Sequence, residues 1–509
     1  MKLIICILLL GLLTACGGAA DDAGGGSSGG NTQSSAESSN QVSSQASLPD
    51  TASSTSSVSS PTNASSSSSS QASSVSSTVA SSSSSTASVS SSTSSSLVSS
   101  SSAVNSSQSS SSMSSTPSSS IASSSTSSSS STSSSSSTSS SSSGGAAPNN
   151  IKAGGGDQQV LLDWQIVTDA DSYRVFFASE PNIDPLNIAA YDDGDWQTAP
   201  APPFTVSGLT NGKTYYFVIA AMQAGNESEA STEVQATPSQ PATSLSASVA
   251  ETLMVELVNR ARFDPPAEAA RFNIDLNDDL PAGTLTGEQR PPLAFNELLM
   301  NAARSHSQWM LDTNTFSHTG AGGNSLTDRI SAAGYSLTGS WTAGENISVT
   351  GSIPAPNLVN AAVSQHQGLF KSADHRKNIL NASFRELGIG QREGDFTFDS
   401  GTYPSSMITQ NFARHGSGYF ISGVVYRDSD NNGRYSAGEG LGGITVSAGN
   451  ASAVTSNAGA YSIARTNGNY VVAAFGTGLD LVTNTVTVGS ANKKVDIVVT
   501  GSTGQLNQW

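Results

Sequence analysis

A serine tract fills much of the N-terminal part of the chain and limits where folded domains can lie. From residue 24 to residue 143 the sequence is nearly all serine, with scattered Thr, Ala, Val, Gln and Asn. Such a stretch has almost nothing to bury and cannot offset the entropy of ordering its backbone, so we expect it to be disordered. As a flexible chain it would have a mean reach of about 60 Å. The tract predicts a spacer, and folded domains are expected only after it.

The first residues, MKLIICILLLGLLTACGGAADD, predict an exported protein. One basic residue precedes an apolar run that is too short for a normal membrane span, as in a secretory signal over residues 1–15. The motif LTAC resembles the bacterial lipoprotein box, which implies that cleavage leaves Cys16 as an acylated N-terminus. An ordinary cleaved signal, with Cys16 as a free thiol, is the alternative. Gly17 stands where an inner-membrane retention signal would place Asp, so the resemblance implies an outer-membrane anchor facing the cell exterior, followed by a linker to residue 148.

The charge balance excludes two classes of partner. The formal net charge is -17 and the pI is about 4.5, which argues against binding to nucleic acid or to an anionic membrane surface. Contact with a membrane is therefore expected only through the lipid anchor. Cys6 leaves with the signal, so no disulfide is possible within the mature chain and core burial must stabilise the domains.

Residues 149–238 show the pattern of a β-sandwich. Short alternating segments bounded by turn residues recur at strand spacing. Trp164, Tyr173 and the tract LTNGKTYYFVIAA, in which Leu209 and Tyr215 have the spacing of a tyrosine corner, resemble a fibronectin type III domain. These residues serve the core and the corner, so we expect a spacer, with ligand binding as the alternative.

Helical periodicity begins after residue 245. Leu253, Leu257 and Val258 share one face of a helix that Pro265 and Pro266 end. Further helices are predicted over 295–313, with Asn296 as the N-cap, over 324–335 and over 356–380, and strands follow. Helices with interspersed strands predict a layered α+β domain over 245–416.

All five histidines of the chain fall in this domain, at positions 306, 318, 366, 375 and 415. The motifs NTFSHTG, AGENIS, SADHRKNIL, ELGIG and ITQNF occur in an order and spacing that resemble the CAP superfamily of cysteine-rich secretory proteins, antigen 5 and pathogenesis-related 1 proteins, in its bacterial branch. The resemblance implies an α-β-α sandwich with a cleft that carries His318, Glu345 and His375. The family's second glutamate lies three residues before the last histidine, where this chain has Ser372.

Three chemistries are open for this cleft. The two imidazoles could hold an exchangeable zinc ion while the carboxylate orients a water molecule on it or accepts its proton. The same side chains could instead form a structural hydrogen-bond network or transfer a proton in catalysis. Ser372, one helical turn before His375, allows a fourth, a serine nucleophile, although no oxyanion hole is identifiable. We expect His306 to pack within its helix and His366 and His415 to be solvated.

A calcium loop is predicted over DSDNNGRYSAGE, residues 428–439. Oxygen ligands fall at the required positions and Gly433 allows the sharp turn at position 6. The predicted ligands are Asp428, Asp430, Asn432, Arg434 through its carbonyl, Ser436 and Glu439. An acidic surface turn is the alternative. Because strands flank the loop on both sides, the module over 417–509 resembles SdrD-type B repeats of bacterial surface proteins, which implies a β-sandwich that calcium stiffens.

The sequence thus predicts a multidomain surface lipoprotein with two β-sandwiches around a CAP domain. Binding of an extracellular lipid, glycan or protein in the CAP cleft is the preferred function, and enzymatic activity is left open. A metal-assisted hydrolase that uses His318, Glu345 and His375 is the first rival. An adhesin, in which the β modules make the contacts and the CAP domain is a scaffold, is the second.

Overall fold

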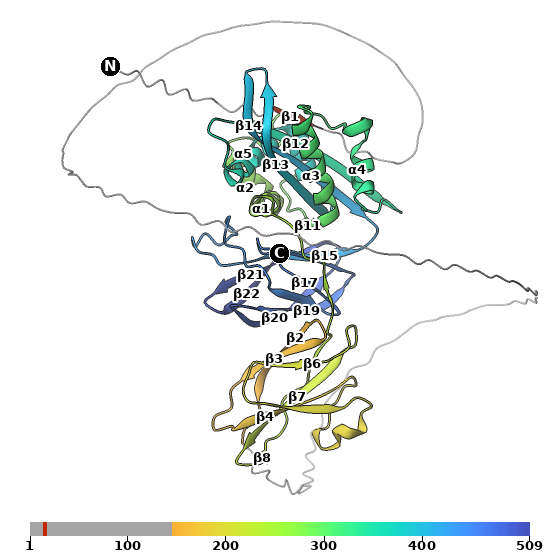
Figure 1. The fold of residues 1–509 in the computed structure, drawn as a ribbon, viewed down its shortest axis with the longest axis vertical. Coiled ribbons are helices and arrows are strands. Elements are labelled where there is room, and N and C mark those ends of the chain that lie inside the picture. Colours follow the sequence, from red (N-terminus) through yellow and green to blue (C-terminus); the bar gives the residue numbers. More distant parts are fainter. Residues whose placement is uncertain (1–13, 18–144) are drawn as a thin grey trace, which may run out of the picture. The chain divides into compact units, whose positions relative to one another are not determined.

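The computed structural model describes residues 14–17 and 145–509 (Figure 1). The predicted signal sequence up to residue 13 and the serine tract lie outside the described residues, and so does the side chain of Cys16. Within the described parts of the chain, no helix is long and apolar enough to cross a membrane.

The first folded module is a sandwich of two antiparallel sheets. One sheet has the order β2-β3-β6 and the other β5-β4-β7-β8, with β9 also paired to β7. The strands are β2 Asn149–Gly156, β3 Gln159–Gln165, β4 Ser172–Ala178, β5 Asp195–Ala199, β6 Phe204–Ser207, β7 Tyr215–Gln223, β8 Asn226–Glu227 and β9 Val234–Ala236, with a 3-10 helix over Pro185–Ala190. Trp164 and Tyr173 meet edge to face in the core, 5.1 Å between ring centroids. The Tyr215 hydroxyl accepts a hydrogen bond from the Thr210 amide at 3.2 Å, as the corner spacing predicts.

The middle domain has a five-stranded sheet in the order β1-β12-β14-β13-β11. The strands are β1 Thr14–Gly17, β11 Ala294–Phe295, β12 Trp341–Gly351, β13 Glu386–Phe398 and β14 Gly401–His415. The helices are α1 Val249–Phe263, α2 Pro265–Arg271, α3 Glu297–Asp312, α4 Leu326–Ala332, α5 Leu358–Lys371 and α6 Ala373–Ile379, with a 3-10 turn over Ala321–Gly323. β1 pairs antiparallel with β12 over Asn346 to Val349, so it lies along an edge that no other described strand covers.

Helices cover both faces of this sheet, as the α-β-α prediction requires. Along β14, Ile408 and Phe412 pack against α1 and α5, whereas Met407 and Ala413 pack on the side of α3 and α4. This alternation follows from the two-residue period of a strand. Figure 1 shows α3 and α4 on one side of the sheet and α1 and α5 on the other.

Local sequence signals set most helix ends in this domain. Ser248 and Glu251 form a capping box at the start of α1, and Pro265 and Pro266 begin α2 directly after α1 ends. The Asn296 side chain caps α3 by accepting from the Leu299 amide at 3.0 Å, as predicted.

One predicted helix is wrong. The segment 356–380 is not continuous, because Ser372 adopts an extended conformation, φ -76° and ψ 127°, between α5 and α6. Arg262 of α1, which is fully buried, holds α6 in its separate position by donating to the carbonyls of Ile379 and Asn381 at 2.7 and 2.9 Å. His375 therefore belongs to a short helix of its own.

The C-terminal module is a second sandwich, as predicted. Its sheets have the orders β18-β15-β21-β22 and β10-β17-β16-β19-β20. The strands are β10 Pro241–Ala242, β15 Tyr419–Tyr426, β16 Thr445–Ala448, β17 Ala451–Val454, β18 Ala460–Arg465, β19 Gly468–Gly476, β20 Leu479–Val488, β21 Lys493–Thr500 and β22 Thr503–Gln508. β10 comes from the segment between the first two domains. The buried Lys494 of β21 forms an ion pair with Glu256 of α1 at 2.9 Å.

Candidate functional site

The centre of the candidate cleft is Glu345 on β12, which is only 4% exposed. His318 Nδ1 lies 2.8 Å from its Oε1, and Arg329 of α4 donates to its Oε2 at 2.6 Å. Glu345 lies two residues from Ala343 and two from Ile347 along β12, so its side chain is on the same face of the sheet as theirs. That face is the one covered by α3 and α4. Both carboxylate oxygens are thus engaged by neighbouring side chains.

The surroundings keep Glu345 ionised. Burial alone would raise its pKa, but the hydrogen bond with His318 and the charge of Arg329 outweigh burial and lower the pKa below its ordinary value of 4.5. Since the carboxylate is charged, His318 Nδ1 carries the proton of this hydrogen bond. His318 is the more accessible partner, with its side chain 25% exposed.

The loop that carries His318 is fixed by backbone contacts. Arg329 donates from Nη1 to the carbonyl oxygens of His318 and Asn324 at 2.9 and 3.1 Å. Ser325 and Asp328 form a capping box that fixes the start of α4. Arg329 directly follows Asp328, so the position of its side chain is fixed with the helix start. His306 of α3 lies with Nε2 2.9 Å from the Ser317 carbonyl oxygen. The loop is therefore held from α3 and α4 together.

His375 and Ser372 lie on the other side of β12. The Ser372 hydroxyl and His375 Nδ1 are 2.7 Å apart. The side-chain amide of Asn346 donates to the His375 backbone carbonyl at 3.3 Å, and the side-chain amide of Asn378 donates to the Glu345 backbone carbonyl at 3.2 Å. Segments covering opposite faces of the sheet thus meet at β12. Ser372 does not cap α6 with its side chain, so its hydroxyl is free to hold the imidazole.

The three predicted metal-binding side chains of the cleft do not form a three-ligand site. In residues 145–509, Asp428, Asp430 and Glu439 are the only three such side chains whose ligand atoms all lie within 4.8 Å of one another. His318 and Glu345 are directly bonded, but the pair and His375 are not brought to that spacing. A zinc ion held by all three side chains does not fit the residues as they are placed. The zinc ion expected on the two imidazoles alone stays a prediction.

Sequence reasoning missed Arg329 and misjudged His366. The signal for Arg329 was its place on the same helical face as Leu326, Ile330 and Ala333. His366 was expected to be solvated, but it is 1% exposed and lies 2.9 Å from Glu268 Oε1. It packs edge to face with Phe272, so it belongs to the core between α2 and α5.

His306 and His415 have different surroundings. His306 is buried in the domain, as expected, and stacks on Trp309 of the same helix. His415 is only partly exposed and packs edge to face against Tyr335, 5.0 Å between centroids, so the expectation of a solvated side chain holds only in part.

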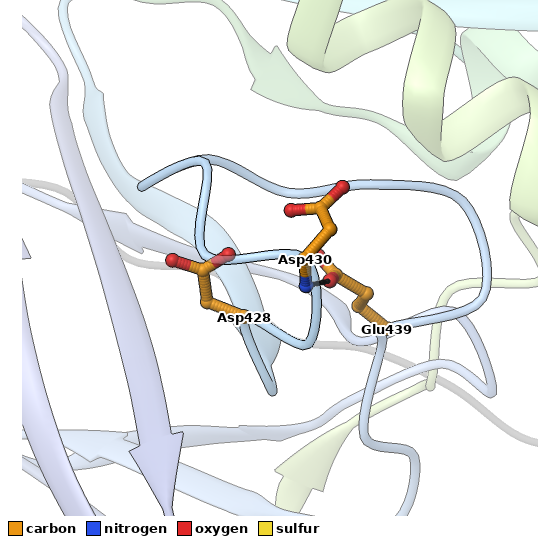
Figure 2. A group of neighbouring side chains, drawn as sticks. All are labelled: Asp428, Asp430 and Glu439. Carbon is orange, nitrogen blue, oxygen red and sulfur yellow. Dashed lines mark hydrogen bonds between the residues drawn. The ribbon is translucent and has the colours of Figure 1, made fainter.

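The predicted calcium loop gathers its carboxylates (Figure 2). One carboxylate oxygen each of Asp428, Asp430 and Glu439 lies within 4.8 Å of the other two, and Figure 2 shows the three side chains near one another in the loop. Glu439 is buried and accepts from the Ser429 and Ser436 amides at 2.7 and 2.8 Å. The Ser436 hydroxyl donates to Asp430 at 2.8 Å and holds the pKa of that carboxyl below its ordinary value.

The remaining predicted ligands of this loop have these places. Asn432 Oδ1 accepts from the Arg434 amide at 2.7 Å, and Gly433 has φ 74°. The Arg434 side chain is exposed, which leaves its carbonyl as the relevant group. Carboxylate oxygens at this spacing are the kind of ligand that a hard divalent cation takes, and calcium binding stays a prediction.

Comparison with known families decides what the middle domain is. Residues 255–403 match the family model described as CAP, cysteine-rich secretory protein family. The chain contains a CAP domain. Over 102 residues it is 37% identical to the uncharacterized protein YkwD of Bacillus subtilis (strain 168). This match covers 20% of this chain and 35% of that relative. The match thus spans about a third of the relative's length.

Solved structures similar to the chain carry fibronectin-type names. One is an Fn3-like protein from Clostridium thermocellum, at 22% identity, with a TM-score of 0.15, covering 20% of this chain and 97% of that one. Another is the fn3 domain of human collagen alpha-1(XX), at 19% identity, with a TM-score of 0.17, covering 21% and 99%.

The Glu345 network should be a main source of stability for the CAP domain. Replacing Glu345 with Ala leaves the buried Arg329 guanidinium without its counter-charge, so we expect a loss of about 3–5 kcal/mol in the free energy of unfolding. Urea denaturation measures this. The matched control is Glu288→Ala, whose side chain is 79% exposed and should change stability by less than about 0.5 kcal/mol. Equal effects of the two substitutions would show that the network does not hold the fold.

Proposed function

We propose that the CAP domain binds an extended segment of another polypeptide along the edge of β12, without hydrolysing it. The observation that carries the proposal is the pairing of β1 with β12. The four residues of β1 form an extra antiparallel strand at the edge of the sheet, beside Asn346 to Val349 of β12. An open strand edge offers unpaired amide and carbonyl groups to an extended peptide. The cleft residues Glu345 and His375 flank this edge and would contact the side chains of such a ligand.

The state of Glu345 supports binding over hydrolysis. A general base works best with a pKa near the operating pH, but the pKa of Glu345 is lowered by His318 and Arg329. Its oxygens accept hydrogen bonds from His318 and Arg329, which stabilise the ionised carboxylate and make it a weaker base. Ser372 and His375 give weaker support to the alternative of a hydrolase with a serine nucleophile. Their hydrogen bond of 2.7 Å joins a hydroxyl to an imidazole that could act as a base.

The proposed setting is the bacterial outer membrane. Acylation of Cys16, a serine tether, a fibronectin-like spacer and a calcium-stiffened β-sandwich would carry the CAP domain away from the surface. Cleavage before Cys16 would also remove Thr14 and Ala15, half of β1, and so open the β12 edge to another chain. An adhesin, in which the β modules make the contacts, is the rival that this arrangement leaves.

The C-terminal loop is proposed to bind calcium. Three carboxylates within 4.8 Å of one another repel each other, and a divalent cation would relieve that repulsion. Extracellular calcium is abundant enough to fill a site with a Kd in the range of about 10⁻⁴–10⁻³ M.

The peptide proposal is tested with a fluorescent peptide of residues 11–20 and a chain that begins at residue 16, with Cys16→Ser to prevent acylation. We expect saturable binding by fluorescence anisotropy. The matched control is the same peptide methylated on the four backbone amides of residues 14–17, which removes the donors of a strand pair while keeping the side chains. Binding of both peptides alike, or of neither, would contradict strand addition.

The hydrolase rival is tested by zinc calorimetry in excess calcium, comparing the Cys16→Ser chain with and without His318→Ala/His375→Ala. Because Glu345 is already engaged and three ligands do not gather, we expect no zinc binding in the micromolar range that depends on the two histidines. A micromolar site lost in the double variant, together with peptide cleavage that a chelator stops, would favour the hydrolase instead.

Calcium should raise the thermal stability of the full chain. Saturation at about 100 times the Kd would add about 2.7 kcal/mol to the unfolding of the unit that contains the loop. The variant Asp430→Asn/Glu439→Gln should lose this shift in calorimetric melting, whereas Asp395→Asn, an exposed carboxylate outside the loop, should keep it. An equal calcium shift in the loop variant would rule out the site.

A further inference from the structure

The predicted calcium loop contacts the CAP domain through Tyr435. Residues 145–509 lie within one compact unit of the structure. Tyr435 is only 6% exposed, and its ring packs edge to face on Tyr426 of β15, 6.0 Å between ring centroids. Both tyrosines belong to the same buried apolar cluster as Leu253 and Leu257 of α1. One side chain of the loop is therefore part of the contact between the CAP domain and the C-terminal module.

The position of Tyr435 depends on the shape of the loop. Tyr435 stands between Arg434, whose carbonyl is a predicted ligand, and Ser436, which is another. The Ser436 amide donates to the Glu439 carboxylate at 2.8 Å, and the Arg427 amide donates to the Glu439 backbone carbonyl at 3.0 Å. These bonds tie the segment that carries Tyr435 to both ends of the loop, so a loop that widens would move Tyr435.

The charges of the loop favour widening when no cation is bound. One carboxylate oxygen each of Asp428, Asp430 and Glu439 lies within 4.8 Å of the other two. Like charges at this spacing repel one another, whereas a divalent cation between them would draw them together. We therefore expect an empty loop to relax outward and a filled loop to hold Tyr435 against α1.

The contact leaves room for such a movement. A cavity of about 230 Å³ lies between the loop and α1. Its lining includes Leu253, Glu256 and Leu257 on the α1 side, and Gly433, Arg434 and Tyr435 on the loop side. The loop can therefore shift beside α1 without disturbing the core of either domain.

Other contacts keep the two domains together whatever the state of the loop. Where the chain passes from one domain to the other, Arg385 donates to the carbonyls of Gly416 and Gly418 at 3.2 and 2.8 Å. The Asn492 side-chain amide donates to the carbonyls of Pro292 and Arg385 at 3.0 and 2.6 Å. None of these groups belongs to the loop, so losing the Tyr435 contact would loosen the α1 side and leave the domains attached.

The ion pair of Glu256 with Lys494, at 2.9 Å, is a further tie between α1 and the C-terminal module. Burial raises the pKa of Glu256, because the charged carboxylate is costly away from water. A buried ion pair of this kind adds little net stability relative to apolar groups in its place. The apolar contact of Tyr435 is the part of this side that calcium can strengthen.

We propose that calcium in the loop fastens α1 of the CAP domain to the C-terminal module through Tyr435, and that the empty loop releases this side of the contact. The inference rests on the calcium site proposed above and adds a regulatory role to it. Because the two equilibria are linked, the docked helix raises the calcium affinity of the loop by the same factor by which calcium favours docking.

The test measures the exposure of a thiol placed at this contact. The chain that begins at residue 16 with Cys16→Ser contains no cysteine, so Leu253→Cys adds a single reporter on α1. Leu253 is 7% exposed, so the reporter reacts with Ellman's reagent only when the contact opens. We expect saturating calcium to slow this reaction about tenfold. A reporter on α3, Ala302→Cys, lies on the other side of the sheet and should not respond to calcium.

Substitutions in the reporter chain separate the fastening of α1 from calcium binding. Tyr435→Ala removes the ring but no predicted ligand, so calcium should still bind by calorimetry, with a Kd about tenfold weaker, and should no longer slow the labelling. Tyr435→Phe should behave like the parent, because within residues 145–509 nothing bonds to the Tyr435 hydroxyl. Tyr470→Ala is the matched control, since this partly buried tyrosine of β19 packs on a different cluster and should leave both measurements unchanged.

Each contrary outcome has a distinct meaning. If calcium binds but the labelling of Leu253→Cys does not slow, the calcium site stands and the fastening of α1 is wrong. The fastening is also wrong if Tyr435→Ala keeps the full calcium effect, or if the Ala302→Cys reporter is slowed equally, since calcium would then stabilise the whole chain. If calorimetry detects no calcium binding to the parent, the calcium site itself is wrong and this inference with it. Thermal melting of each variant shows that it is folded.

Discussion

The buried carboxylate of Glu345 is the group on which the arrangement of the CAP domain depends. Its charge sits inside the domain only because Arg329 neutralises it and His318 donates to it. Those two partners come from α4 and from the loop after α3, so one residue of β12 joins both segments to the strand. Removing the carboxylate would leave the buried Arg329 guanidinium without a counter-charge. The resulting loss of stability is far larger than the net stability that the ion pair adds relative to apolar residues in its place.

This way of stabilising the cleft also limits its chemistry. His318 at one oxygen of Glu345 and Arg329 at the other lower the pKa of this carboxyl and keep it ionised. A carboxylate with a lowered pKa is a weak base, so Glu345 is better suited to positioning side chains than to transferring protons. On the other side of β12, the Ser372 hydroxyl lies 2.7 Å from His375 Nδ1 and orients that imidazole. A cleft with one engaged carboxylate and two oriented imidazoles is suited to recognising a ligand laid along the strand edge.

Several parts of this architecture were readable from local sequence because local physics decides them. The capping residues Ser248 and Asn296 begin helices through bonds to the next turn, and alternation along β14 assigns the faces of the sheet. The break at Ser372 was not predicted, although Ser followed by Ala and Asp resembles a helix start. Helical periodicity continues across it, and contacts with residues distant in sequence, among them Arg262 of α1 and Asn346 of β12, hold α6 apart from α5.

The sequence by itself determined the order of modules, the CAP motifs with His318, Glu345 and His375, and the calcium-loop pattern, because each depends on residue spacing within a short segment. The tertiary structure decided which groups meet. It paired Glu345 with Arg329, buried His366 against Glu268, and, within residues 145–509, left His306 Nδ1 and Asn324 Oδ1 buried without a hydrogen-bond partner. These contacts join residues far apart in the chain, and their energies depend on burial, which periodicity can suggest but not locate.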